Sequence, residues 1–266
     1  MFSVFDGFIL GFVQGIAEWL PISSEAMVNL IAINILKIDP ASALNLALVL
    51  HIGTALSALV YFRQTIFELL LNPQKNKALL QFYSVITAVS LLVGGLLYLA
   101  LKQITVMVSG GAWLTVLMGV ALLVTAWLLR TGERGLRKDN DVTLSDAFLF
   151  GGVQGLAVVP GISRSGSTVA ALLWRHYRSS DALALSFIMG IPMIFAGALL
   201  LLLTEPAVLS ASTSIAGLTA LGASFIVGLG SIAALLKLAR KINFAKFVLL
   251  IGVLAIAAGL IDILLV

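Results

Sequence analysis

The sequence has no cysteine, and only 11% of its 266 residues are charged. Without cysteine, the chain has neither disulfides to hold a small extracellular module together nor a thiol for catalysis. A soluble domain of this length carries about 25% charged residues. The deficit extends along the whole chain, so it excludes a large water-soluble domain, and we predict one integral-membrane domain over residues 1–266. The first cation is Lys37, so we expect no cleavable signal peptide.

Apolar sequence is abundant, with 61% of residues hydrophobic. A membrane-spanning helix needs about 20 apolar residues. Stretches of this kind are residues 43–62, 79–101, 112–129, 182–203, 213–236 and 246–265. Two other apolar stretches, 2–36 and 145–178, are interrupted by polar, proline-containing clusters at 21–25 and 160–168. Proline breaks a helix, and non-helical backbone at membrane depth must be buried in protein or line a watery cavity.

The distribution of Lys and Arg indicates how the broken stretches enter the membrane. If each enters and leaves on the same side, every Lys and Arg outside the second break lies on one side except Lys37 and Lys102. If each crosses once, the cations divide almost evenly. Positive residues collect on the cytoplasmic side, so we predict two re-entrant hairpins in the inner (plasma) membrane, with both termini extracytoplasmic. The net charge of +4 then reflects topology, and we expect no nucleic-acid partner.

The two broken stretches also resemble each other. Residues 11–21 read GFVQGIAEWLP, and residues 151–160 read GGVQGLAVVP. A second match, between residues 43–52 and 182–191, follows at the same relative offset. Two matched blocks favour an internal repeat over chance similarity.

Each half of the chain, about 1–130 and about 141–266, is therefore predicted to be a re-entrant helix-loop-helix hairpin followed by three transmembrane helices. Three spans are an odd number, so the second half is inverted. The predicted fold is an all-α polytopic membrane protein with an inverted-topology repeat. Such repeats bring their broken helices together near the membrane midplane, where a site forms.

The first hairpin carries acidic residues at membrane depth. Gln14 and Glu18 are four residues apart and share one helical face ahead of the break. A carboxylate is costly inside a bilayer, which favours a functional role over a purely structural ion pair. Ser23, Ser24 and Glu25 follow the proline, and Glu25 could be solvated at the hairpin mouth.

The second hairpin surrounds one arginine with glycines and hydroxyl groups. These residues are Gly161, Ser163, Arg164, Ser165, Gly166, Ser167 and Thr168. Glycine-rich backbone can turn its N–H groups toward an anion, the N-terminus of a following helix favours negative charge, and guanidinium matches phosphate geometry. We interpret the segment as a phosphate-binding site. The alternative is that Arg164 only neutralises Glu18 across the repeat interface.

The acidic residues of the first hairpin and the phosphate-binding site of the second together indicate phosphoryl transfer. Glu18 and Gln14 offer the oxygen ligands that a hard divalent cation prefers. That cation and Arg164 would offset the charge that develops on a transferred phosphoryl group. Either Ser24 or a water held by Glu18 is the nucleophile.

At these residues the chain resembles the undecaprenyl-diphosphate phosphatase (BacA) family over essentially its whole length. The resemblance rests on residues 11–25, on 50–63 (LHIGTALSALVYFR), on 160–168 (PGISRSGST) and on the run that ends at Pro192. It implies hydrolysis of the terminal phosphate of a C55 polyprenyl diphosphate, giving the monophosphate carrier and inorganic phosphate. It also implies dependence on Mg²⁺ or Ca²⁺, recycling of the cell-wall lipid carrier and bacitracin resistance.

The resemblance assigns roles to particular residues. We expect Glu18, Ser24 and Arg164 to be catalytic, and Glu18 with Gln14 to hold the metal. The expected substrate-binding residues are Gln14, Ser23, Gly161, Ser163, Ser165, Gly166, Ser167 and Thr168.

One departure concerns the nucleophile. Many family members have a histidine where this chain has Met27, and a thioether cannot accept a proton. Glu25, or a water activated by Glu18, would then take over. His51 is a further candidate, although we interpret it as a packed, hydrogen-bonding interior histidine.

Two other functions remain open. Inverted repeats with broken helices are common in transporters, so the runner-up is a transporter or flippase of an anionic polyprenyl-phosphate lipid. A structural scaffold is the third, and the cost of burying Glu18 and Arg164 argues against it. The sequence predicts neither the lipid chain length nor the oligomeric state.

Overall fold

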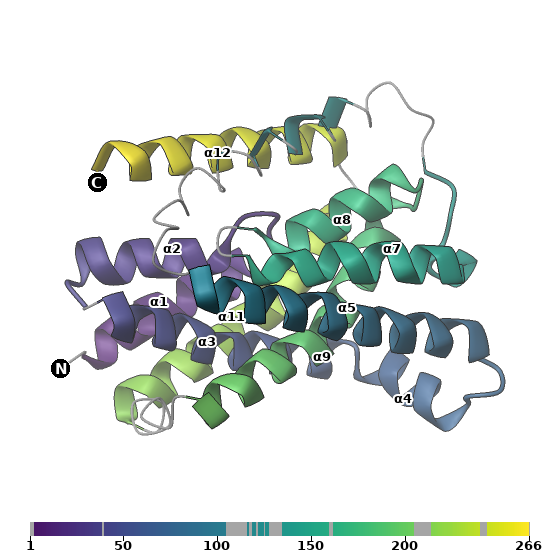
Figure 1. Ribbon diagram of the computed structural model, residues 1–266, viewed down its shortest axis with the longest axis horizontal. Helices are drawn as coiled ribbons and strands as arrows, with labels where there is room; N and C mark the ends of the chain where they lie inside the picture. The colour runs from purple at the N-terminus through teal and green to yellow at the C-terminus, as the bar shows by residue number, and fades with distance from the viewer. Residues whose placement is uncertain are drawn as a thin grey trace.

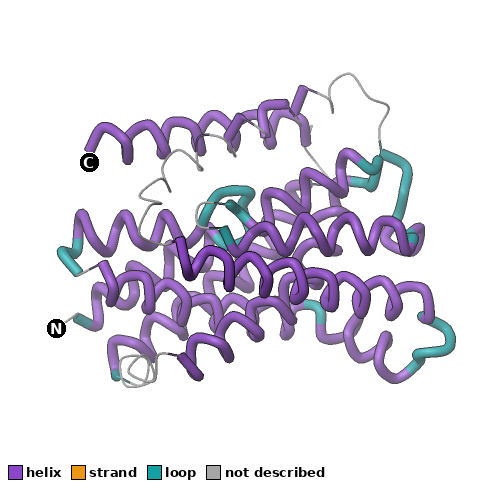
Figure 2. Tube along the Cα trace, in the orientation of Figure 1, coloured by secondary structure: helices purple, strands orange, loops and turns teal. Residues whose placement is uncertain are grey.

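The computed structural model describes residues 3–38, 40–104, 116, 119–120, 122–124, 126–127, 135–159, 162–204, 214–239 and 244–265. Over these residues the regular structure is helical, as Figure 2 shows. The all-α prediction is confirmed. Most of the predicted span 112–129 lies outside the described residues.

The first half begins with a helix at the N-terminal end of the chain (Figure 1), and Ser3 and Asp6 cap this helix reciprocally. The Ser3 hydroxyl accepts from the Asp6 amide at 3.2 Å, and the Asp6 carboxylate accepts from the Ser3 amide at 2.7 Å. The helix ends before Pro21, and the chain turns before it becomes helical again. The elements are α1 (Val4–Ala17), α2 (Ser24–Leu30), the π-helical turn η1 (Ile31–Ile35), α3 (Pro40–Tyr61), α4 (Arg63–Leu71) and α5 (Lys77–Ile104).

The second half has a similar broken start. The Thr143 hydroxyl accepts from the Asp146 amide at 3.2 Å, and the Ser163 hydroxyl accepts from the Gly166 amide at 3.1 Å, so each hydroxyl caps one helix of the hairpin. The elements are η2 (Asp139–Asp141), α7 (Leu144–Gly155), η3 (Leu156–Val158), α8 (Arg164–Trp174), α9 (Ser179–Thr204), α11 (Ile215–Ala239) and α12 (Phe244–Leu265).

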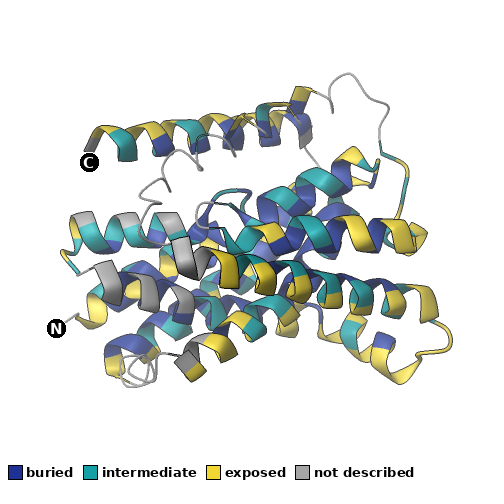
Figure 3. Cartoon of the chain, viewed as in Figure 1, coloured by how far each residue is buried: buried dark blue, intermediate teal, exposed yellow. Residues whose placement is uncertain are grey.

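Several of these helices suit a membrane. Among the described residues, Lys77–Ala100, Ser179–Leu200 and Ile215–Ala239 are long and apolar enough to cross one, and a fourth span results if Val49–Tyr61 and Arg63–Leu71, bent by 67°, count together. Many residues on the outer faces of the helices are exposed (Figure 3). The exposed residues include many large apolar ones, such as Leu203, which is 73% exposed. In a bilayer these faces contact lipid, so the chain is a multi-pass membrane protein.

Close backbone contacts join the first hairpin to the second half and the second hairpin to the first half. Helix α1 packs on α11, and α7 packs on α5. At Gly11 a Cβ atom would lie 2.2 Å from the Ala220 carbonyl oxygen, and at Gly155 it would lie 2.7 Å from Cβ of Val93. Only glycine permits these approaches, so each hairpin is seated against a helix from the other half.

A buried carboxylate ties the two ends of the second hairpin together. Asp146, in the first turn of α7, is fully buried and accepts from Arg175 Nε at 2.8 Å, just beyond the end of α8. Arg137, Thr143 and Tyr177 also donate to it. Burial alone would raise the pKa of the Asp146 carboxyl, but these hydrogen bonds outweigh burial and hold that pKa well below its usual range. The second broken stretch therefore doubles back on itself.

Candidate active site

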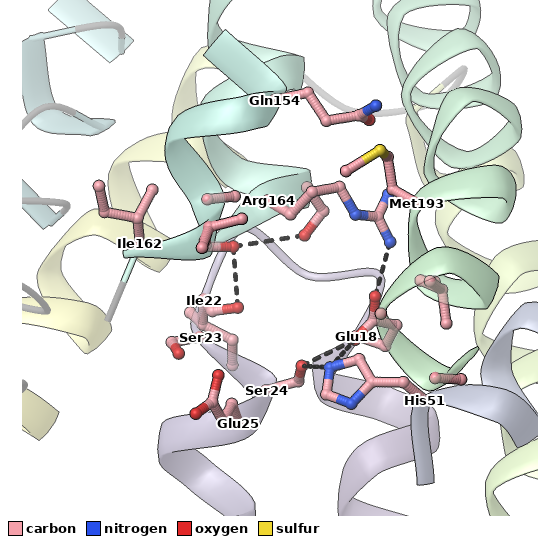
Figure 4. A pocket seen from close by; sticks show the side chains of 17 residues that line it. Glu18, Ile22, Ser23, Ser24, Glu25, His51, Gln154, Ile162, Arg164 and Met193 are labelled. Carbon is pink, nitrogen blue, oxygen red and sulfur yellow. Dashed lines mark hydrogen bonds and ion pairs between the residues drawn. The ribbon is translucent and has the colours of Figure 1, made fainter. Parts of the chain in front are cut away.

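The centre of the site is Glu18, which follows the last residue of α1 and is 5% exposed. Its Oε1 atom accepts from Arg164 Nη2 at 2.6 Å. Its Oε2 atom accepts from Ser24 Oγ at 2.7 Å (Figure 4) and from Gln14 Nε2 at 3.0 Å. The two hairpins thus meet at an ion pair between residues that are 146 positions apart in sequence.

His51, on α3, belongs to the same cluster. Its Nε2 atom lies 3.2 Å from Glu18 Oε2 and 3.4 Å from Ser24 Oγ. Its Nδ1 atom lies 2.7 Å from the Ala47 carbonyl oxygen, which can only accept, so Nδ1 carries a proton. The sequence named His51 both as a candidate site residue and as a hydrogen-bonding interior histidine, and these contacts place it beside Ser24 and Glu18. Met27 lies on α2 and is not among the residues that line the cavity.

Arg164 is fixed from several sides. Its Nη1 atom donates to the Ser186 carbonyl oxygen at 3.2 Å, and its guanidinium carbon lies 5.9 Å from the centre of the Trp19 ring. The guanidinium passes directly over Gly190, where a Cβ atom would be 2.1 Å from Nη1. The absence of a side chain at Gly190 therefore leaves the space through which Arg164 reaches Glu18.

The serines at the start of α8 bind the first hairpin. Ser163 Oγ donates to the Ile22 carbonyl oxygen at 2.9 Å, and Ser165 Oγ donates to the Leu20 carbonyl oxygen at 2.8 Å. Both serines line the cavity. They hold the two breaks against each other and present their hydroxyl oxygens to the site.

The remaining predicted phosphate-site residues lie behind this wall. Ser167 and Thr168 donate to the carbonyl oxygens of Ser163 and Arg164, at 2.9 and 2.8 Å, and neither lines the cavity. Gly166 packs against Pro21. Gly161 lies outside the described residues. The structure therefore gives Ser167 and Thr168 contacts that stabilise α8.

A cavity of about 190 Å³ opens beside this cluster (Figure 4). Its lining is Glu18, Ile22, Ser23, Ser24, Glu25, His51, Gln154, Ala157, Val158, Ile162, Ser163, Arg164, Ser165, Met193, Ile194, Gly197 and Ala198. Most of the predicted site residues thus face one space. Gln14 is buried and contacts Glu18 without lining the cavity.

Gln154 is a cavity residue that the sequence reasoning did not assign. Its Nε2 atom donates to Ser90 Oγ at 3.0 Å and to the Met189 carbonyl oxygen at 3.2 Å. Its Oε1 atom is buried without a hydrogen-bond partner, an arrangement that is costly unless a ligand or water supplies a donor. The signal was available, since Gln154 occupies the same position in the repeat as Gln14.

The donors for a divalent cation are few. The described residues include no group of three or more His, Cys, Asp or Glu side chains that could hold a metal. Glu18 and Glu25 both line the cavity. Mg²⁺ in phosphate sites is commonly held by one or two carboxylates together with substrate phosphate oxygens and waters. The two carboxylates fit a cation that binds with its substrate.

Comparison with known proteins bears on this geometry. The sequence pattern of the family described as "Bacitracin resistance protein BacA" matches residues 7–257. The chain is 41% identical over 260 residues to the undecaprenyl-diphosphatase of Methanopyrus kandleri, covering 95% of this chain and 94% of the relative. It is 37% identical to the undecaprenyl-diphosphatase of Methanococcoides burtonii, covering 96% and 98%. That of Pyrobaculum islandicum is also 37% identical, covering 97% of each chain. With a match over nearly its whole length, the chain belongs to the BacA family.

Proposed function

We propose that this protein is a membrane hydrolase that removes the terminal phosphate of undecaprenyl diphosphate, leaving the monophosphate lipid and inorganic phosphate. Its family and the undecaprenyl-diphosphatase names of its relatives support this activity. The observation that carries the proposal is the buried Glu18–Arg164 pair on a cavity wall that also contains Ser24. The names of the relatives favour hydrolysis over a flippase.

The side chains suggest a division of labour. Arg164, fixed over Gly190, binds the terminal phosphate and offsets charge as the phosphorus–oxygen bond to the leaving monophosphate breaks. Ser24 donates to Glu18 at 2.7 Å, so Glu18 is placed to take a proton from Ser24 or from a water that replaces it as the nucleophile. His51 provides an imidazole beside Ser24. Met27, at the position where many family members have a histidine, has no such group.

A divalent cation, Mg²⁺ or Ca²⁺, fits this site as a partner of the diphosphate. Glu25 and Glu18, which both line the cavity, would hold the cation. Gln14 would orient Glu18 through its 3.0 Å hydrogen bond. The cation would supply positive charge against the phosphate oxygens. A higher Mg²⁺ or Ca²⁺ concentration for half-maximal activity in Glu25→Gln would support this assignment.

We also propose the finer topology: an inverted repeat of two re-entrant hairpins in the inner membrane, with extracytoplasmic termini. The exchanged packing of α1 on α11 and α7 on α5 supports an inverted pair. The contact of Asp146 with Arg175 supports a second hairpin whose ends lie on one side. Cysteine labelling from each side of the membrane, at introduced Ser3→Cys and Lys75→Cys, tests the orientation.

The activity is tested with purified protein in detergent, undecaprenyl diphosphate and Mg²⁺ or Ca²⁺, by release of inorganic phosphate. We expect release by the wild type and its loss in Arg164→Ala and Glu18→Ala. Lys75→Ala is the matched control, because it removes an exposed cation far from the site in sequence and retains activity. Absence of release by the wild type, or release undiminished in both site variants, would refute the proposal.

A further inference from the structure

The cavity has two chemically different walls. The polar wall comes from the two breaks, α3 and the start of α8, and contains the ion pair and the serines. Gln154 of α7 is a further polar lining residue, and the second, apolar wall comes from η3, the segment that follows it, and α9. Its residues are Ala157, Val158, Ile162, Met193, Ile194, Gly197 and Ala198. None of these side chains can bind phosphate, so the second wall suits a hydrocarbon.

The apolar wall is open at Gly197. This residue is exposed, and a Cβ atom added to it would meet nothing within 4 Å. It lies within Ser179–Leu200, one of the stretches long and apolar enough to cross a membrane. Its neighbours Leu199 and Leu200 are exposed apolar side chains. At this edge the cavity therefore faces the lipid side of α9.

We propose that the apolar wall binds the first isoprene units of the substrate, and that the chain leaves the cavity toward the bilayer past Gly197. This inference rests on the proposed function. A diphosphate bound at Arg164 carries its hydrocarbon on the far side from the terminal phosphate. The apolar wall receives that end, because it belongs to the same cavity and is continuous with the polar wall. A hydrocarbon chain that binds there is removed from water and contacts apolar side chains, which is favourable.

Substitution of Gly197 by leucine tests the site without crowding the protein. The new side chain enters open space at the cavity edge and competes with the isoprene chain. Gly230→Leu on α11 is the matched control, since Gly230 is also exposed, has nothing within 4 Å of an added Cβ and does not line the cavity. Both variants make the same change on a lipid-facing helix surface.

For Gly197→Leu we expect kcat/KM with undecaprenyl diphosphate to fall about tenfold or more, the scale of discrimination by apolar pockets. The inhibition constant of inorganic pyrophosphate, which has no chain, should stay unchanged. Gly230→Leu should match the wild type in both measurements. Three results would overturn the inference. The first is an unchanged kcat/KM in Gly197→Leu, and the second is an equal fall of kcat/KM in Gly230→Leu. The third is inhibition by pyrophosphate that weakens in Gly197→Leu by the same factor as kcat/KM.

Equilibrium binding of undecaprenyl monophosphate separates this inference from the proposed function. A wild type that binds the lipid without hydrolysing the diphosphate would refute the hydrolase. The affinity of Gly197→Leu relative to Gly230→Leu would still decide the chain site, weaker binding supporting it and equal binding overturning it.

Discussion

Deleting the guanidinium of Arg164 separates what the buried ion pair does for folding from what it does for chemistry. Arg164 makes the shortest contact to Glu18, 2.6 Å, against 2.7 Å for Ser24, 3.0 Å for Gln14 and 3.2 Å for His51. Removing one partner of a buried pair costs about 3–5 kcal/mol, because the other charge stays buried. Three partners remain around Glu18, so we expect a loss near the lower end, about 3 kcal/mol in the free energy of unfolding.

The double variant Glu18→Gln/Arg164→Ala removes both charges of the ion pair, so neither partner is left buried without the other. Most of the lost stability should therefore return, measured by denaturant unfolding in detergent micelles. Phosphate release should not return, because loss of a group that stabilises charge in the transition state costs about 10²–10³ in kcat. Activity is normalised to the amount of folded protein, so that instability is not mistaken for lost chemistry.

Two results would refute this reasoning. An Arg164→Ala variant as stable as the wild type would show that the pair is not a buried interaction of the folded protein. Restored phosphate release in the double variant would show that Arg164 serves only to neutralise Glu18, the alternative that the sequence left open.

Three further predictions follow from neighbouring contacts. Gly190→Ala should lower phosphate release about 10²-fold, because its Cβ would displace the guanidinium, whereas Gly230→Ala should have no effect. His51→Ala should lower phosphate release by a similar factor through loss of the imidazole beside Ser24; retained activity would exclude His51 from the chemistry. Because the folded-state pKa of Asp146 lies below the ordinary value of 3.8, its stabilisation is complete above that pH and is lost as pH falls toward the folded-state pKa. Asp146→Asn should therefore lower stability at neutral pH and weaken its loss on acidification; an unchanged acid unfolding profile would contradict this.

The fold was largely readable from the sequence because lipid imposes length and composition on each span. Over the residues that the structure describes, the apolar stretches 43–62, 79–101, 182–203, 213–236 and 246–265 coincide with helices to within one residue at their ends. The 67° bend between α3 and α4 was not predicted. The sequence there has Phe62 and Arg63 but neither proline nor glycine, the residues that usually indicate a sharp bend.

The site residues could be predicted from the sequence where several polar residues lie together in a short segment. Glu18, Ser24 and Arg164 stand in polar breaks within apolar sequence, and they meet in space. His51 and Gln154 lie inside apolar helices, where one polar residue has two equally plausible orientations. Only the rotation of α3 and α7 about their axes decides whether such a residue faces the cavity, and that rotation depends on contacts with distant helices.

Matched positions in the two similar segments of sequence contribute to the site in complementary ways. In the second block of sequence similarity His51 corresponds to Gly190. In the first half the imidazole fills the space beside Glu18. In the second half Gly190 has no side chain, so the guanidinium of Arg164 can pass over the helix at this position and reach the carboxylate of Glu18. One position thus supplies a functional group and the matched position supplies room for one, so two similar segments of sequence build a single asymmetric site.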